Sequence, residues 1–174
     1  MQIEKRRLGQ SGLDVTVMGL GLWAMGGADF GPTEDQHSLD TIDAALDAGV
    51  TFFDTADVYG DGHSESLLGR AMRGRLERFI VATKIGWQGY DDAAQRSQYD
   101  DPRKIVAGVE ESLRRLDTDY VDLLQWHIDI QDHTMQNALE GFRQLKQAGK
   151  VRAFGLSTSD FDYLQAFNAE GDCA

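Results

Sequence analysis

Short apolar runs alternate with amphipathic stretches along this chain, and this alternation limits the possible fold more than any other feature. The sequence contains five successive units of strand, loop and helix. The apolar runs are residues 17–23, 51–54, 79–84, 120–127 and 151–157. Strands that alternate with helices typically form a parallel sheet with the helices packed outside it. The sequence therefore predicts an α/β fold, with a doubly wound sheet and a barrel as the open alternatives.

Signals for helix ends support this alternation. Thr33-Glu34-Asp35-Gln36 has the form of a capping box. Asp101-Pro102 places a capping residue before a proline at the first helical position. The helix after it has one predicted inward stripe: Ile105, Val109, Ser112, Leu113 and Leu116. Residues 3–8 and 13–18 flank a glycine-containing turn, which predicts a β-hairpin before the first unit.

Composition limits the partners and the location of the protein. The chain has 174 residues and a net charge of -12, which argues against a nucleic-acid or anionic-membrane surface. No apolar run is long enough to cross a bilayer, and the N-terminus lacks a signal-peptide core. The single cysteine, Cys173, rules out an internal disulfide and fits a reducing compartment. We therefore expect one cytoplasmic domain, or a piece of one, with no nucleic-acid or membrane partner.

A glycine pattern near the N-terminus allows a dinucleotide-binding alternative. Residues 19–24, Gly-Leu-Gly-Leu-Trp-Ala, match the loose fingerprint GxGxxA. That fingerprint requires a helix to start inside it, whereas residues typical of a loop continue to Pro32. The position of the first helix therefore distinguishes a Rossmann fold from a barrel.

Polar residues stand at or next to the ends of four successive apolar runs. They are Asp54, Lys84, His127 and Ser157, and Tyr59 lies on the loop after the first of them. Barrel active sites draw residues from the carboxyl ends of several strands, so we expect these side chains to meet there.

These residue types together suit the protonation of a carbonyl oxygen. A cation beside a phenol makes the phenol a better proton donor near neutral pH. Lys84 can be that cation for Tyr59, Asp54 can hold Lys84 in place, and His127 can orient the carbonyl. None of these groups supplies electrons, so a reduction needs a bound hydride donor.

Other functions remain open for the same residues. Asp54 and Lys84 can be a structural ion pair, and His127 a core histidine. Lys84 can also form a Schiff base, although Asp54 favours its charged form. His127, Asp129 and His133 approximate a metal site without the spacing of a known motif, so no metal is predicted. Trp87, Tyr90 and Tyr99 are equally compatible with a pocket wall and with loop anchors.

Several segments resemble the aldo-keto reductase family. The segments are 7–13, 19–21, Phe53-Asp54-Thr55-Ala56-Asp57-Val58-Tyr59-Gly60, 64–69, Ala82-Thr83-Lys84 and Asp122-Leu123-Leu124-Gln125-Trp126-His127. The resemblance runs from about residue 3 to about residue 165. It implies a (β/α)₈ TIM barrel that binds NADP(H), or less often NAD(H), and reduces an aldehyde or ketone. Residues 1–174 would then form a single, partial oxidoreductase domain.

The resemblance also implies roles for individual residues. Asp54, Tyr59, Lys84 and His127 would be catalytic, with Tyr59 as the general acid. The implied cofactor-binding residues are Leu22, Trp23, Asp54, Ser157 and Thr158. Trp23 and Trp87 would line the substrate pocket.

Two features depart from the family pattern. Thr158 stands where the family often has asparagine, and a hydroxyl has fewer donors than an amide. A barrel also typically needs about 250 residues, whereas this sequence contains only five units and the hairpin. The alternative function is therefore a catalytically inactive fragment or binding module with a relict site. We also expect self-association through the open edges of an incomplete sheet.

Overall fold

The computed structural model describes residues 3–27, 30–87, 99–127 and 133–174. A parallel sheet of five strands forms its centre, in the order β3-β4-β5-β6-β7. The strands are β3 (Gly19–Gly21), β4 (Phe52–Asp54), β5 (Ile80–Ile85), β6 (Val121–Trp126) and β7 (Val151–Leu156). The strands lie side by side in chain order, without the reversal of a doubly wound sheet. This is the arrangement of a barrel wall.

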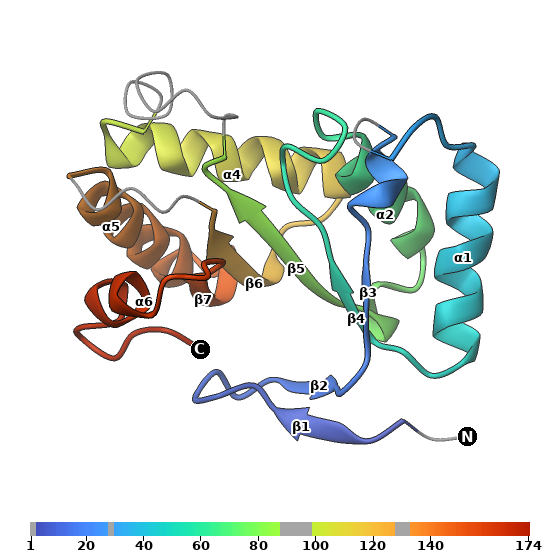
Figure 1. The fold of residues 1–174 in the computed structure, drawn as a ribbon, viewed down its shortest axis with the longest axis horizontal. Coiled ribbons are helices and arrows are strands. Elements are labelled where there is room, and N and C mark those ends of the chain that lie inside the picture. The colour runs from blue at the N-terminus through green and yellow to red at the C-terminus, as the bar shows by residue number, and fades with distance from the viewer. Residues whose placement is uncertain (1–2, 28–29, 88–98, 128–132) are drawn as a thin grey trace.

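The helices pack outside this sheet (Figure 1). They are α1 (Asp35–Asp47), α2 (His63–Met72), α4 (Pro102–Leu116), α5 (His133–Gln147) and α6 (Phe161–Phe167), and the single 3₁₀ turns are η1 (Ala24–Gly26) and η2 (Leu76–Arg78). Only the short turn η1 follows the glycine fingerprint, and the first α-helix starts at Asp35. No helix N-terminus therefore meets these glycines, and the Rossmann alternative is wrong.

Side-chain alternation along the strands divides the apolar core into two clusters. The larger cluster lies between the sheet and the helices and includes Val81, Ile85, Leu124 and Trp126. The smaller cluster faces the other way and contains Ala82, Leu123 and Ala153. Lys84 and Gln125 share the strand side of this smaller cluster, because they stand two residues beyond Ala82 and Leu123. Polar site residues therefore point inward, where a barrel has its active site.

The predicted hairpin is present as β1 (Lys5–Arg7) and β2 (Asp14–Thr16), which pair antiparallel. Figure 1 shows the hairpin below the strand starts, at the opposite end from the strand tips. Leu8 and Leu13 from its turn pack against the inner cluster. The hydroxyl of Thr16 also accepts a hydrogen bond from Thr51 N–H at 3.1 Å, which fixes the hairpin against β4. The hairpin thus covers the amino end and leaves the carboxyl end accessible.

Helix α4 begins as its sequence predicts. Asp101 is the N-cap, its carboxylate accepts a hydrogen bond from Arg103 N–H at 2.8 Å, and Pro102 follows. The buried residues of this helix are those of the predicted stripe: Ile105, Val109, Ser112, Leu113 and Leu116. The sequence pattern and the structure therefore agree on which face of α4 meets the sheet.

Two local predictions are wrong. The capping box at residues 33–36 does not form, because Glu34 is the N-cap of α1 and makes no side-chain cap. The hydroxyl of Thr33 instead donates to the carbonyl oxygen of Met25 at 3.4 Å. The first predicted strand, residues 17–23, is reduced to Gly19–Gly21, because Val17 and Met18 are exposed and η1 begins directly after Trp23.

The sheet does not close within the described residues. β3 and β7 are its two end strands, and each pairs with a single neighbour. One carbonyl group of β7, that of Phe154, accepts a hydrogen bond from Ala174 N–H at 2.9 Å. Among the described residues, no helix is long and apolar enough to cross a membrane.

Candidate active site

The ammonium group of Lys84 is the centre of the site. Lys84 lies near the end of β5 and is 5% exposed. Its Nζ atom donates to Asp54 Oδ1 at 2.6 Å, to the Thr55 carbonyl oxygen at 2.9 Å and to Tyr59 Oη at 3.1 Å. An ammonium group has three donors, so these three acceptors fully orient it. The structure thus brings together Asp54, Tyr59 and Lys84, which are 5 to 30 positions apart in the sequence.

The direction of the Tyr59 hydrogen bond has a chemical consequence. Lys84 is only a donor, so the phenol oxygen accepts this bond. The phenol proton is therefore left for another acceptor. Lys84 also lies 4.8 Å from the centre of the Tyr59 ring. This arrangement can donate a proton and stabilise the phenolate that remains.

Gln125 completes the surroundings of Asp54 and was missed by sequence reasoning. Its amide nitrogen donates to Asp54 Oδ2 at 3.2 Å, so both carboxylate oxygens of Asp54 are hydrogen-bonded. Gln125 pairs in register with Lys84 on the neighbouring strand. A polar residue inside the apolar run 120–127 was the available signal. Together these contacts hold the Asp54 carboxylate in one orientation.

Two backbone segments cross closely beside Tyr59. Gly60 has a φ of +61°, and a Cβ there would overlap the carbonyl group of Gly26 and lie 2.7 Å from its Cα. A Cβ on Gly26 would lie 2.6 Å from the nitrogen of Gly60. Only glycines allow this approach, which brings the Tyr59 loop against η1.

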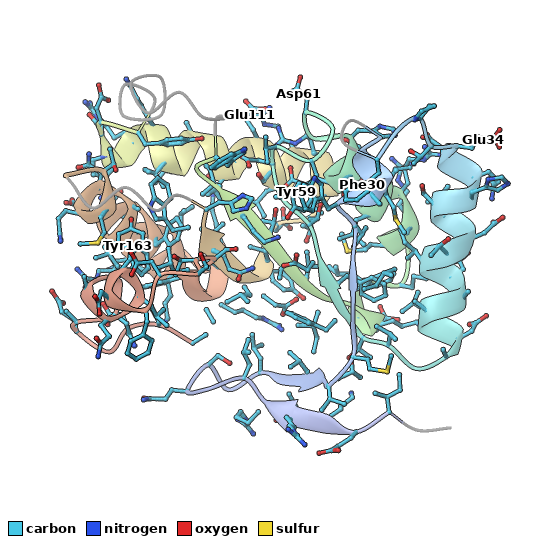
Figure 2. The ribbon with its side chains drawn as sticks, viewed as in Figure 1. Phe30, Glu34, Tyr59, Asp61, Glu111 and Tyr163 are labelled. Carbon is cyan, nitrogen blue, oxygen red and sulfur yellow. The ribbon has the colours of Figure 1, made fainter. Side chains whose placement is uncertain are left out.

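Aromatic rings form one wall of the site. The ring of Trp23 stacks on Tyr59 with centroids 5.8 Å apart, and Phe30 meets Trp23 edge-on at 5.1 Å. Trp23 and Phe30 are exposed, and Figure 2 shows Tyr59 and Phe30 at the carboxyl end of the sheet. Phe30 was not predicted, because it lies in a glycine-rich loop without a strand pattern. The ring of Trp87 lies 6.3 Å from that of His127.

His127 directly follows β6, and its backbone N–H donates to the Ile85 carbonyl oxygen at 3.0 Å. Its ring meets the ring of Tyr59 edge-on, with centroids 6.1 Å apart. Burial, and then the charge of Lys84, lower the pKa of His127 from 6.5 to about 4. The imidazole is therefore neutral near pH 7. Its buried Nδ1 atom has no hydrogen-bond partner in the part of the chain that the structure describes.

The remaining predicted residues differ in what they offer. Ser157 follows β7, is half-buried and stands two residues beyond Gly155 of that strand. The Thr158 hydroxyl accepts a hydrogen bond from Asp160 N–H at 2.9 Å, which leaves its own proton to donate. Leu22 is 0% exposed; its N–H donates to the Asp54 carbonyl oxygen and its carbonyl accepts from the Ser64 hydroxyl. Leu22 thus packs behind the site.

The structure also bears on the competing assignments. Tyr99 is a loop anchor: it is 2% exposed and meets Trp126 edge-on at 5.4 Å. Tyr90 and Asp129 lie outside the described residues. Among the residues that are described, no three His, Cys, Asp or Glu side chains gather as metal ligands. The amine of Lys84 is already hydrogen-bonded to Asp54, Thr55 and Tyr59, which argues against its use as the nucleophile of a Schiff base.

Comparisons with known proteins agree with this geometry. The family model described as "Aldo/keto reductase family" matches residues 17–174. The aldo-keto reductase YhdN of Bacillus subtilis (strain 168) is 37% identical over 171 residues, which are 96% of this chain and 50% of that protein. This chain spans about half the length of the curated relatives it matches.

Solved structures give the same result. The holo form of aldo-keto reductase AKR11C1 from Bacillus halodurans has a TM-score of 0.82 and 32% identity, over 97% of this chain and 54% of that chain. An aldo-keto reductase from Klebsiella pneumoniae in complex with NADPH has a TM-score of 0.75 and 30% identity, over 100% of this chain and 57% of that chain. The parallel sheet with its helices is therefore an incomplete TIM barrel, as the sequence predicts.

Proposed function

Because this chain belongs to the aldo/keto reductase family, a family of oxidoreductases, we propose that it carries the proton-donating site of an NADPH-dependent carbonyl reductase. The observation that supports this most is the single amine of Lys84, bound at once to Asp54 and to Tyr59. The substrate class is a small aldehyde or ketone. No nucleic acid or membrane takes part in the proposed reaction.

Tyr59 is the proposed general acid. A carbonyl oxygen in front of Tyr59 would receive the phenol proton that the Lys84 contact leaves available. The charge of Lys84 then stabilises the phenolate, and Asp54 keeps that charge in place. The neutral imidazole of His127 can donate one N–H to the same carbonyl oxygen and so fix its direction. The phenolate regains a proton from solvent after the alcohol leaves.

A nicotinamide cofactor fits the inner side of this sheet, where it would supply the hydride for the carbonyl carbon. Ideal Cβ atoms on Gly21 and Gly155 would have no described atom within 4 Å, so the wall there is open. Gly21 pairs in register with Asp54, and Gly155 with Gln125, which places this space at the level of the site. Ser157 and Thr158 are the proposed hydrogen-bond donors to the cofactor. The Klebsiella relative in complex with NADPH favours NADP(H) over NAD(H) for this chain.

The alternative is a catalytically inactive module that keeps the site on an incomplete barrel. The open sheet favours it, because β3 and β7 do not pair with each other in the described part of the chain. Both functions can be tested by joining residues 1–174 to the remaining half of a relative such as YhdN, which we call the completed form. NADPH oxidation with aldehydes and ketones should be measured for the chain and for the completed form. A completed form that binds NADPH and reduces no carbonyl would favour the inactive module.

A further inference from the structure

Behind the active site, on the helix side of the sheet, lies a buried ionic cluster. Glu65 of α2 is 0% exposed, and its two oxygens accept from Thr83 Oγ1 at 2.5 Å and from Arg115 Nε at 2.6 Å. Thr83 directly precedes Lys84, so the two side chains leave β5 in opposite directions. Gly62 makes room for this arrangement, because a Cβ there would lie 2.5 Å from Arg115 Nε. Glu65 therefore anchors β5, the strand that carries Lys84, from the helix side of the sheet.

The neighbouring residue Ser64 holds two more strand ends. Its hydroxyl donates to the Leu22 carbonyl oxygen at 3.0 Å and shares a 2.8 Å hydrogen bond with Thr55 Oγ1. Thr55 is also the residue whose carbonyl oxygen accepts from Lys84. Two successive residues of α2 thus fix the ends of β3, β4 and β5 from behind.

Asp57 links this cluster to the Tyr59 loop. It precedes Tyr59 by two residues, and its backbone N–H donates to the Lys84 carbonyl oxygen at 3.0 Å. Its carboxylate faces the backbone N–H groups of Val58 and Gly86. One oxygen, Oδ1, is buried without a hydrogen-bond partner among the described residues. Asp57 thus spans the Tyr59 loop and the end of β5.

Charge around Asp57 is unbalanced. Among the described residues, the charged groups that act on it are Glu65 on α2 and Arg115 on α4. One guanidinium cannot neutralise the carboxylates of both Glu65 and Asp57, and Arg115 is already bound to Glu65. Burial, then the charge of Glu65, raise the pKa of Asp57 to about 7 although Arg115 opposes this. Asp57 can therefore carry a proton at pH values where an ordinary aspartate is charged.

We infer that Asp57 is a positioning residue for the Tyr59–Lys84 pair, through its contacts with the Tyr59 loop and the end of β5 and under the charges of Glu65 and Arg115. This inference rests on the proposed function, because the pair it positions is the proposed acid. Protonated Asp57 is not repelled by Glu65, so the contact between the Tyr59 loop and the end of β5 is tight. When Asp57 ionises, its charge is buried and is repelled by Glu65; these two effects outweigh the N–H groups of Val58 and Gly86, so the segment around Asp57 opens more easily.

Two measurements on the 174-residue chain test this inference without turnover, so their outcome is independent of whether the chain reduces carbonyls. The first is the infrared C=O band of protonated carboxyl groups between pH 5 and 9. The second is amide hydrogen exchange of residues 80–87, corrected for the intrinsic effect of pH. Both also work on associated protein. The variants are Asp57→Asn and Glu65→Gln, with Asp61→Asn as the matched control, since Asp61 is an exposed aspartate of the same loop.

In the wild-type chain and in Asp61→Asn, a carboxyl band should disappear near pH 7, with a several-fold rise in exchange of residues 80–87 through the same step. Asp57→Asn should lack both the band and the step. Glu65→Gln should move the step to lower pH, because it removes a like charge. A wild-type spectrum identical to that of Asp57→Asn above pH 5 would overturn the inference. The same pH dependence of exchange in the wild-type chain and in Asp57→Asn would also overturn it. The comparison of these two proteins is sufficient even if Glu65→Gln does not fold.

Discussion

The Nζ atom of Lys84 lies 3.1 Å from the phenol oxygen of Tyr59, and the amine is the donor of this hydrogen bond. The phenol proton is therefore not donated in this hydrogen bond. The same amine is held 2.6 Å from Asp54. This relationship connects a buried ion pair to an acid that faces the open side of the sheet.

Removal of the charge of Lys84 should destabilise the protein more than removal of both charges. Lys84→Met leaves the Asp54 carboxylate without its cation, and breaking a buried pair typically costs about 3–5 kcal/mol. The side chain of Asp54 is 32% exposed, so we expect the lower end of this range. The double variant Lys84→Met, Asp54→Asn should recover part of the loss. Denaturant unfolding of the completed form measures both, and a double variant less stable than Lys84→Met would contradict the ion-pair account.

Because of His127, the folded protein should become less stable as the pH falls. The pKa of His127 is about 4 in the folded protein and 6.5 as its ordinary value. Between these values the unfolded chain binds a proton that the folded chain does not, so the free energy of unfolding should fall as pH falls from 6.5 to 4. His127→Gln should remove this part of the pH dependence. The comparison is denaturant unfolding of both proteins at several pH values, and equal slopes would show that His127 titrates normally.

Gly60→Ala should be much more damaging than Gly74→Ala. Both glycines have positive φ, +61° and +72°. A Cβ on Gly74 meets no described atom within 4 Å, so alanine there costs only the left-handed backbone, about 1–2 kcal/mol. A Cβ on Gly60 overlaps Gly26, which adds an overpacking cost of about 1–3 kcal/mol. Thermal unfolding of both variants tests this, and equal losses would mean that the Gly26–Gly60 contact yields easily.

The sequence was a good guide where local chemistry and strand order decide the structure. Asp54, Lys84 and His127 could be predicted at one end of the sheet, because parallel strands align their carboxyl ends. The contacts of Gln125 and Phe30 could not be predicted. Gln125 reaches Asp54 only through the register of β5 with β6, and Phe30 reaches Trp23 through a loop.

Long-range contacts also explain the failures. Thr33 and Gln36 match a capping box in sequence, but Thr33 bonds to Met25 across the η1 turn. In the sequence, nothing distinguishes Ser64, Glu65 and Arg115 from ordinary polar residues of helices. Their role depends on how α2 and α4 pack behind the strand ends. Such packing is determined by tertiary structure and has no local signal.

We predict that the 174-residue chain self-associates and reduces no carbonyl at a useful rate. β3 and β7 expose backbone groups at the two ends of the described sheet, and unpaired edges favour association. Phe161 and Leu164 on α6 add exposed apolar surface, with 68% and 37% of their area accessible. The expected result is oligomers in size-exclusion chromatography and binding of the dye ANS. A monodisperse monomer that oxidises NADPH with an aldehyde would contradict this prediction.

The most direct test of the proposed function compares the completed form with its Tyr59→Phe variant. The substitution removes one hydroxyl and little volume, so the fold and NADPH binding should survive. General acid catalysis typically contributes about 100-fold to 10,000-fold, so carbonyl reduction should fall by at least about 100-fold. The measurement is the rate of NADPH oxidation with an aldehyde at saturating cofactor, with the dissociation constant of NADPH as the control. A rate in Tyr59→Phe comparable to that of the parent protein would contradict the assignment of Tyr59 as the acid.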